Sequence, residues 1–257
     1  MLKVTLLGTG TSGGVPALGC ECDVCRSTDP KDKRLRSAAM IETESTRLLI
    51  DAGPDIRQQM LRVPFRKIDG LLITHKHYDH VGGIDDLRPF CKYGDINIYG
   101  DKGVTKSLPV TMPYCFPASS KELYPGAPKL QLHTIEPHHI YKIGDIEWMP
   151  VKVMHDKMPI LGFRFGKFAY ITDMKTIPDE ELPYLKGLEV LVVNALRFDK
   201  LHHSHQLVDD AIRFAIRIGA EKVYFTHMTH DIGLHDAANK RLPKGFQFGY
   251  DGQVIEL

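Results

Sequence analysis

The run Thr74-His75-Lys76-His77-Tyr78-Asp79-His80 decides how this chain folds and what chemistry it carries. It holds three histidines and one aspartate within six residues, directly after the apolar run 68–74. An apolar run bounded by turn residues is typical of a buried strand. Imidazole and carboxylate are ligands for zinc, manganese and iron. A polar loop with incidental histidines is the alternative, but four ligand-type residues packed this closely disfavour it.

Other apolar runs in the chain also end in ligand-type residues. Each is rich in β-branched or aromatic residues, so each predicts a buried strand whose end carries function on a rigid scaffold. A two-metal hydrolytic site needs ligands from several segments, including a carboxylate that bridges ions about 3.5–4 Å apart. Asp173 is the candidate bridge. The runs are 48–50 before Asp51, 151–154 before His155, 169–172 before Asp173 and 223–226 before His227.

Three segments predict helices, namely 55–62, 179–185 and 206–218. The last is the strongest, because its apolar residues keep helical spacing and Gly219 supplies a C-cap. Residues 101–130 are rich in Pro, Ser and Gly, which predicts an irregular excursion over the surface near the mouth of the site.

Residues 8–13 match the G-x-G-x-x-G pattern and follow a predicted strand at 4–7. A dinucleotide site also needs a helix to begin at these glycines. Gly14, Pro16 and Gly19 follow instead, so no helix is expected. The pattern therefore predicts a tight turn that brings backbone close to other elements.

Three of the five cysteines, Cys20, Cys22 and Cys25, lie within six residues. An odd count and this spacing favour metal binding over a disulfide framework, with redox or packing use as the alternative. Cys91 and Cys115 stand apart and are expected to be buried free thiols.

Composition limits the classes of function. The chain has 257 residues, 33 basic against 32 acidic, and a net charge of +1, so nothing draws it generally to nucleic acid or anionic membrane. No secretory signal pattern or membrane-length apolar stretch is present in the sequence, and we expect a cytoplasmic protein. Residues 1–257 are expected to form a single domain.

The ordered set T-H-x-H-x-D-H, then a later His, Asp and His at strand ends, resembles the metallo-β-lactamase superfamily over nearly the whole chain. The resemblance implies an α+β fold, the αββα sandwich, with two divalent metal ions, Zn or Mn, in the active site. It also implies that Asp51 supports the site from outside the ligand set. By position, His75, His77 and His155 would hold one ion, Asp79, His80 and His227 the other, and Asp173 would bridge them.

The cysteines narrow the resemblance to PhnP-like cyclic phosphodiesterases, as does the tail at 242–252. That resemblance implies one structural zinc held by Cys20, Cys22, Cys25 and His230, since such a site wants four tetrahedral ligands. It also aligns His205 with a catalytic histidine that protonates the leaving oxygen. His203 lies two residues away and leaves the register open. The ligand pattern does not include His133, His138, His139 and His235, which are expected to be ordinary histidines.

The predicted function is metal-dependent hydrolysis of a cyclic or small phosphodiester, with Asp79 and His205 as catalytic residues. A metal-activated hydroxide would attack phosphorus, and His205 would protonate the leaving group. The alternatives are a tRNA 3′-processing nuclease, a lactonase or a thioesterase of the same fold, and a non-catalytic metal-binding or sensor protein. The expected partner is a small phosphodiester, with no stable nucleic-acid partner and no membrane; a homodimer is left open.

Overall fold

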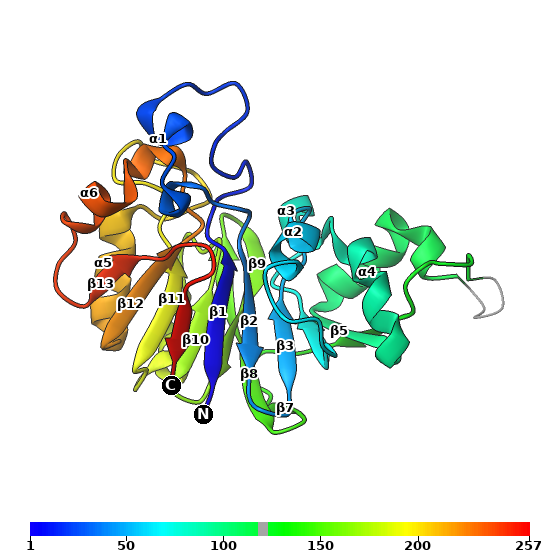
Figure 1. Cartoon of the computed structure of the whole chain (residues 1–257). Coiled ribbons are helices and arrows are strands. Elements are labelled where there is room, and N and C mark those ends of the chain that lie inside the picture. Colours follow the sequence, from blue (N-terminus) through cyan, green and yellow to red (C-terminus); the bar gives the residue numbers. More distant parts are fainter. Residues whose placement is uncertain (118–122) are drawn as a thin grey trace.

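The computed structural model of the chain describes residues 1–117 and 123–257. In it two seven-stranded sheets lie face to face, and helices cover their outer sides (Figure 1). The strand order is β14-β1-β2-β3-β4-β5-β6 in the first sheet and β13-β12-β11-β10-β9-β8-β7 in the second. The predicted αββα sandwich of the metallo-β-lactamase type is confirmed.

The strands of the first sheet are β1 (Lys3–Gly8), β2 (Ala38–Glu42), β3 (Arg47–Ile50), β4 (Gly70–Leu72), β5 (Ile96–Gly100), β6 (Leu130–Thr134) and β14 (Val254–Glu256). Those of the second are β7 (Tyr141–Ile143), β8 (Ile146–His155), β9 (Met158–Phe165), β10 (Phe168–Ile171), β11 (Val190–Asn194), β12 (Lys222–Thr226) and β13 (Phe246–Phe248).

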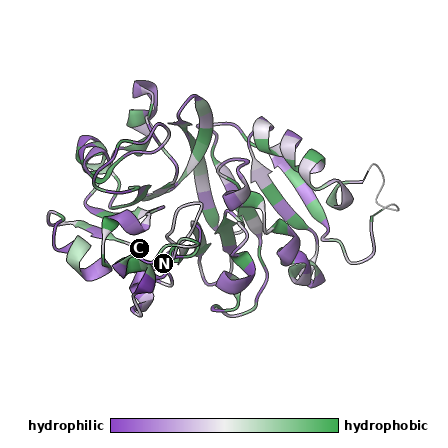
Figure 2. Ribbon diagram, turned by 90° about the horizontal axis from the view of Figure 1, so that it is seen from above, coloured by the Kyte–Doolittle hydropathy of each residue, from purple (hydrophilic) through white to green (hydrophobic). Residues whose placement is uncertain are grey.

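The α-helices are α1 (Asp23–Arg26), α2 (Ile56–Met60), α3 (Tyr78–Val81), α4 (Lys102–Thr111), α5 (Val208–Ile218) and α6 (His235–Asn239). Short 3-10 helices are η1 (Pro30–Asp32), η2 (Ile84–Tyr93), η3 (Pro113–Cys115), η5 (Asp179–Leu185) and η6 (His230–Ile232). Figures 1 and 2 both show the part of the chain around η2 and α4 projecting from one side of the sandwich.

Alternation along the strands builds three packed layers. On β3, Leu48 and Ile50 point into the cluster between the sheets, whereas Leu49 points to the opposite side. There it packs with apolar residues of α2, η2 and α4, while the apolar face of α5 covers the second sheet in the same way. Such alternation follows from the two-residue period of a strand. Figure 2 shows hydrophobic residues along the strands and mostly hydrophilic loops.

Several predicted elements are confirmed with changed bounds. The helix predicted at 206–218 begins at Val208 and ends before Gly219, whose φ of 75° is the left-handed C-cap conformation. The predicted strand at 68–74 shortens to Gly70–Leu72, because Ile73 onward forms the ligand loop. The segment predicted at 179–185 is a 3-10 helix.

The prediction that residues 101–130 are irregular is wrong for their first half. Lys102–Thr111 form α4, although Pro109 lies inside it. The Asp101 side chain caps this helix by accepting a hydrogen bond from the Val104 amide at 2.8 Å. An aspartate at the N-cap is a sequence signal for a helix start. The prolines in this segment favoured an irregular structure instead, so the helix was not predicted. Among the described residues, no helix is long and apolar enough to cross a membrane.

Candidate metal centre

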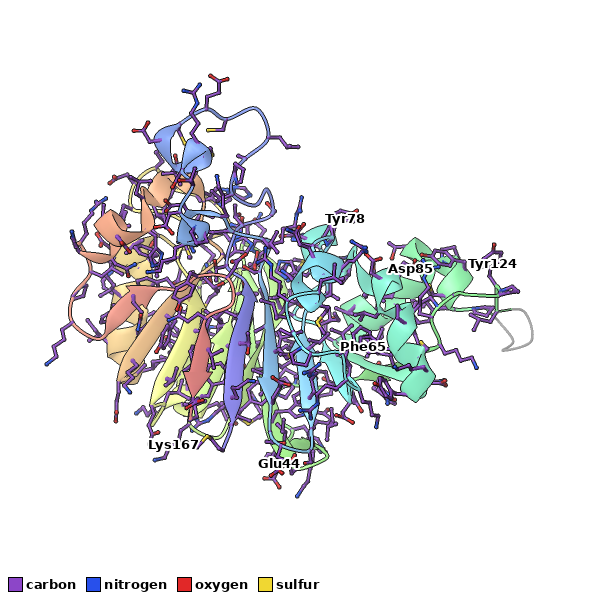
Figure 3. The ribbon with its side chains drawn as sticks, viewed as in Figure 1. Glu44, Phe65, Tyr78, Asp85, Tyr124 and Lys167 are labelled. Carbon is purple, nitrogen blue, oxygen red and sulfur yellow. The ribbon has the colours of Figure 1, made fainter. Side chains whose placement is uncertain are left out.

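The ligand motif occupies the connection that follows β4. Ile73 and Thr74 extend the chain beyond the strand, His75 and His77 lie in the loop, and α3 begins at Tyr78. Asp79 and His80 therefore project from the first turn of a short helix. Figure 3 labels Tyr78 above the upper ends of the strands, whereas Glu44 and Lys167 lie at their lower ends.

Strand direction gathers the remaining ligands at one edge of the second sheet. β8 and β10 are each antiparallel to β9, so they run the same way, and β10, β11 and β12 are parallel. His155 ends β8, Asp173 follows β10 and His227 follows β12. Residues far apart in the sequence thus meet where their strands end.

Three residues of the site have a strained backbone. Asp51, which follows β3 of the first sheet, and Asp173 and His227, at the edge of the second, have positive φ angles of 62°, 58° and 57°. This left-handed conformation is uncommon for residues other than glycine. Such strain persists where the surrounding structure holds it and is often found at functional sites.

His75, His77 and His155 form the first ligand group, with one ring nitrogen of each within 4.8 Å of the others. The Nε2 atom of His75 lies 3.0 Å from Nδ1 of His77. His155 Nδ1 faces the backbone oxygens of Asp173 and Ser204 at 2.8 and 3.0 Å. Carbonyl oxygens only accept, so Nδ1 carries the proton and the Nε2 lone pair of His155 is free for a metal.

Asp79, His80, Asp173 and His227 form the second group. His80 Nε2 lies 3.2 Å from an Asp79 oxygen and 3.3 Å from an Asp173 oxygen. His227 Nε2 lies 3.0 Å from the other Asp173 oxygen. Both Nε2 atoms are buried without a hydrogen-bond partner. Orphaned buried nitrogens facing carboxylates need an explanation, and a cation bound among them would supply it.

Asp173 is also close enough to His155 to join a third overlapping group with His205. It therefore lies between the two main sets, as a bridging ligand must. Burial by itself would raise the pKa of Asp173, but the neighbouring His227 and His80 outweigh it and hold the pKa well below its usual value. An ionised carboxylate suits a metal ligand. The donor set fits two divalent cations.

Asp51 orients the motif from behind. Its fully buried carboxylate accepts hydrogen bonds from the Thr74 amide at 2.8 Å, the Thr74 hydroxyl at 2.9 Å and His80 Nδ1 at 2.7 Å. The last bond fixes the proton on Nδ1, so Nε2 of His80 points its lone pair at the second group. The sequence analysis quoted Thr74 as part of the motif but gave it no role, although its place directly before His75 was the available signal.

The structure brings His205 to the candidate metal ligands and leaves His203 outside. His205 Nε2 lies 3.0 Å from Asp173 Oδ1, and its ring stacks on His227 at a centroid distance of 4.8 Å. Burial lowers the pKa of His205 to about 4, although Asp173 opposes this shift. His203 is exposed, and its ring lies beside His202 at 4.6 Å.

The cysteine loop meets the C-terminal part of the chain. The sulfur atoms of Cys20, Cys22 and Cys25 lie 3.2, 3.2 and 3.3 Å from His230 Nδ1. All three are free thiols. Three sulfurs around one imidazole nitrogen form the donor set of a structural zinc site.

The remaining cysteines and histidines belong to neither group. Cys115 is buried as expected, whereas Cys91 is half-buried, so its predicted burial is wrong. The Cys91 sulfur lies 3.2 Å from the Lys129 amide and 3.8 Å from the Lys129 carbonyl oxygen. In the described part of the chain, the metal-type groups do not include His133, His138, His139 and His235.

Comparison with known proteins agrees with this geometry. Residues 46–228 match the family described as Beta-lactamase superfamily domain. The chain belongs to the metallo-β-lactamase superfamily. Its sequence is 35% identical to that of a protein whose crystal structure is described as a new diphosphatase from the PhnP family. The two structures match with a TM-score of 0.91. The match covers 100% of this chain and 98% of that one, so the predicted PhnP-like relationship is confirmed.

Two other similar proteins differ in what they show. An octanoyltransferase of Porphyromonas gingivalis strain W83 is 41% identical over 252 residues, which cover 98% of this chain. The chain spans about half the length of that relative, 51%. The short form of human tRNase Z is 19% identical with a TM-score of 0.72, covering 99% of this chain and 98% of that one, which shows the fold alone.

Proposed function

We propose that this protein is a metal-dependent hydrolase of small phosphate diesters, cyclic or linear, including molecules with a diphosphate linkage. The observation that carries the proposal is the pair of orphaned buried nitrogens, Nε2 of His80 and of His227, facing the Asp79 and Asp173 carboxylates. A purely structural cluster would satisfy these nitrogens with hydrogen bonds.

The ligand sets divide between two cations, Zn or Mn. His75, His77 and His155 would hold one, while Asp79, His80 and His227 would hold the other. Asp173 would bind both. When bound, two such cations lower the pKa of a shared water and neutralise charge on phosphoryl oxygens. Cys20, Cys22, Cys25 and His230 would hold a separate structural zinc.

His205 and Asp79 are the proposed catalytic residues. His205 is 9% exposed and directs Nε2 at the Asp173 carboxylate, next to the space where substrate would lie over the ligands. Because a carboxylate only accepts, that nitrogen carries a proton. With Nδ1 protonated as well, His205 would give its Nε2 proton to the leaving oxygen and return to neutral imidazole. Asp79, with 14% side-chain exposure, presents an ionised oxygen that can orient the attacking water.

The PhnP-family diphosphatase supports phosphate chemistry and extends the predicted substrates to diphosphate linkages. A nucleic-acid substrate has weaker support. The net charge of +1 offers little of the electrostatic attraction that binding a phosphate backbone requires.

A second candidate is hydrolysis or transfer of an octanoyl thioester, which the name of the Porphyromonas relative favours. Transfer through a covalent intermediate needs a nucleophile close to the reacting centre. Among the described residues, the catalytic ligand groups contain no cysteine, and Cys91 and Cys115 lie with the core on the outer face of the first sheet. We therefore rank this candidate second.

The deciding experiment compares substrates on one metal-analysed preparation. Bis(p-nitrophenyl) phosphate, a P1,P2-disubstituted diphosphate and an octanoyl thioester are each offered with Zn²⁺ or Mn²⁺ added. We expect turnover of the phosphates. If the thioester is cleaved much faster than either phosphate, the second candidate replaces the first, and if none is cleaved by metal-loaded protein, the proposal fails.

Two matched variants then test the acid. His205→Ala should keep both metals but lose turnover, most severely with poor leaving groups, because good ones leave without a proton. His203→Ala is the control and should behave as the parent. The reverse pattern would assign the role to His203.

A further inference from the structure

A pocket on the outer face of the first sheet lies apart from the proposed metal centre. It has a volume of about 310 Å³, and its walls come from β14, β1, β2, β3 and the segment 59–66. Its lining residues, all within the described part of the chain, include none of the candidate metal ligands. Figure 1 shows β1 and β2 with no helix of the described chain in front of them. The pocket therefore opens to solvent on a separate face of the molecule.

Strand pairing arranges the lining side chains of the sheet in two rows. Lys3 on β1 pairs with Glu42 on β2, and Glu42 pairs with Arg47 on β3. Side chains of directly paired residues lie on the same face of a sheet, and so do those two residues further along each strand. The next row of pairs on this face consists of Val254, Thr5 and Met40. A charged row therefore lies beside a mostly apolar row.

The one carboxylate of the lining is already neutralised by its neighbours. Glu42 is the only acidic residue among those that line the pocket, all of which the structure describes. Arg47 Nε donates to Glu42 Oε1 at 2.8 Å, and Lys3 Nζ lies 3.2 Å from Oε2. Any further cation at the pocket is therefore in excess.

Two further arginines, Arg62 and Arg66, line the pocket. Their ion pairs are long, 3.9 Å from Arg62 to Asp251 and 3.7 Å from Arg66 to Glu42. Arg66 Nη2 also donates to the Glu44 carbonyl at 3.2 Å. Among the described residues, neither guanidinium has a carboxylate within hydrogen-bond distance. Guanidinium groups with unused donors are suited to phosphate, which they bind through strong charge-assisted hydrogen bonds.

The buried side of the pocket offers a hydrogen-bond acceptor without a donor. Gln59 lines the pocket and is 1% exposed. Its Nε2 donates to the Arg36 carbonyl at 2.8 Å, whereas its Oε1 is buried with no hydrogen-bond partner among the described residues. Buried acceptors are normally satisfied. An N–H or O–H group of a molecule bound in the pocket would satisfy this one.

We propose that this pocket binds a small phosphomonoester that carries a ring and a hydrogen-bond donor, the chemistry of a nucleoside monophosphate. The phosphate binds Arg62 and Arg66, the ring packs on the apolar row, and a donor reaches Gln59 Oε1. Small-molecule sites have volumes of about 300–1,000 Å³ and combine apolar walls with a few polar groups, as this pocket does. The inference is independent of the proposed function, because it uses no residue of the metal centre.

The test is calorimetric titration with AMP, adenosine and inorganic phosphate. Each is titrated into the metal-loaded parent and into Asp173→Ala, in which the proposed metal centre is impaired. We expect AMP to bind both proteins with a Kd below about 1 mM and to bind more weakly as salt is added. Adenosine lacks the phosphate and inorganic phosphate lacks the ring, so each should bind at least about tenfold more weakly than AMP.

Matched variants locate the binding. Arg62→Gln and Arg66→Gln should each weaken AMP about tenfold, because each removes a charged donor to the phosphate. Their side chains are 49% and 36% exposed, so both variants should fold. Arg57→Gln removes an exposed arginine of α2 that does not line the pocket, and it should bind AMP as the parent does.

Four outcomes would overturn the inference. The first is no saturable binding of AMP to the parent, and the second is unchanged affinity in both arginine variants. The third is binding that Asp173→Ala loses and Arg62→Gln keeps, which would place AMP at the metal centre. The fourth is inorganic phosphate that binds as tightly as AMP, because the pocket would then select no ring.

Discussion

His235 offers a prediction about stability at acid pH. It is 4% exposed, and its Nδ1 lies 3.0 Å from Nη2 of Arg34. A guanidinium only donates, so Nδ1 of His235 must be unprotonated. Its backbone amide donates to Asp32 at 2.7 Å, which ties α6 to the segment after the cysteine loop. Burial first, and then the charges of Arg34 and Lys31, lower the pKa of His235 from 6.5 to about 4.

The sign of the effect follows from proton counting. Between pH 6.5 and 4 the unfolded chain binds a proton at His235 that the folded chain excludes, so stability falls as the pH falls through this window. A shift from 6.5 to about 4 corresponds to about 3 kcal/mol when fully developed, and to about 2 kcal/mol at pH 5. At pH 7 the contribution is close to zero.

His235→Gln keeps an acceptor but cannot titrate. Denaturant unfolding of parent and variant, with metal content matched, is measured at pH 7 and pH 5. The parent should lose about 2 kcal/mol more than the variant between these pH values. His139→Gln, at an exposed position, is the control and should follow the parent. If His235→Gln and the parent lose the same free energy, this histidine is not the acid-sensitive group.

Three other substitutions test the metal sites. Asp173→Ala should leave a folded protein with at least one metal lost and little activity; full turnover with both metals retained, by elemental analysis, would remove its bridging role. Asp51→Asn should weaken metal affinity by roughly 10–100-fold, because His80 loses the carboxylate that orients it, and a metal titration that matches the parent would contradict this. Cys22→Ser should release one tightly held zinc per chain and lower the melting temperature; an unchanged zinc content would rule out the cysteine site.

The clustering of the candidate ligand residues could be predicted from the sequence because their signal is local. His75, His77, Asp79 and His80 lie within six residues, and each remaining ligand directly follows an apolar run. A buried strand fixes the position of the residue that follows it. Because neighbouring strands run parallel, these side chains meet at one edge of the sheet. The signal is local for the cysteine loop too, because Cys20, Cys22 and Cys25 lie within six residues.

What the sequence could not supply are contacts made across the fold. Ser204 reaches His155 through a backbone oxygen, and a carbonyl is present in every residue, so no pattern marks the one that matters. The choice between His203 and His205 depends on how the segment packs against Asp173 rather than on residue type. The helix α4 was not predicted either, because the loop-like composition of residues 101–130 outweighed the single signal of its capping residue, Asp101.

The two proposed metal sites are joined by one short segment and one turn. His227 faces the carboxylates and His230 faces the cysteines, with Met228 fully buried between them. The Met228 amide donates to the Thr9 carbonyl, and the Met228 carbonyl accepts from the Thr11 amide, each at 3.0 Å. The glycine-rich turn is therefore hydrogen-bonded to this segment on both sides of Met228. A Cβ on Gly8 would lie 2.0 Å from the Arg36 backbone oxygen, which explains why this turn needs glycine and confirms the predicted close approach. The pattern that resembles a nucleotide-binding loop therefore holds the segment that carries His227 and His230. Loss of order in the cysteine loop should disturb the candidate catalytic ligands through this segment.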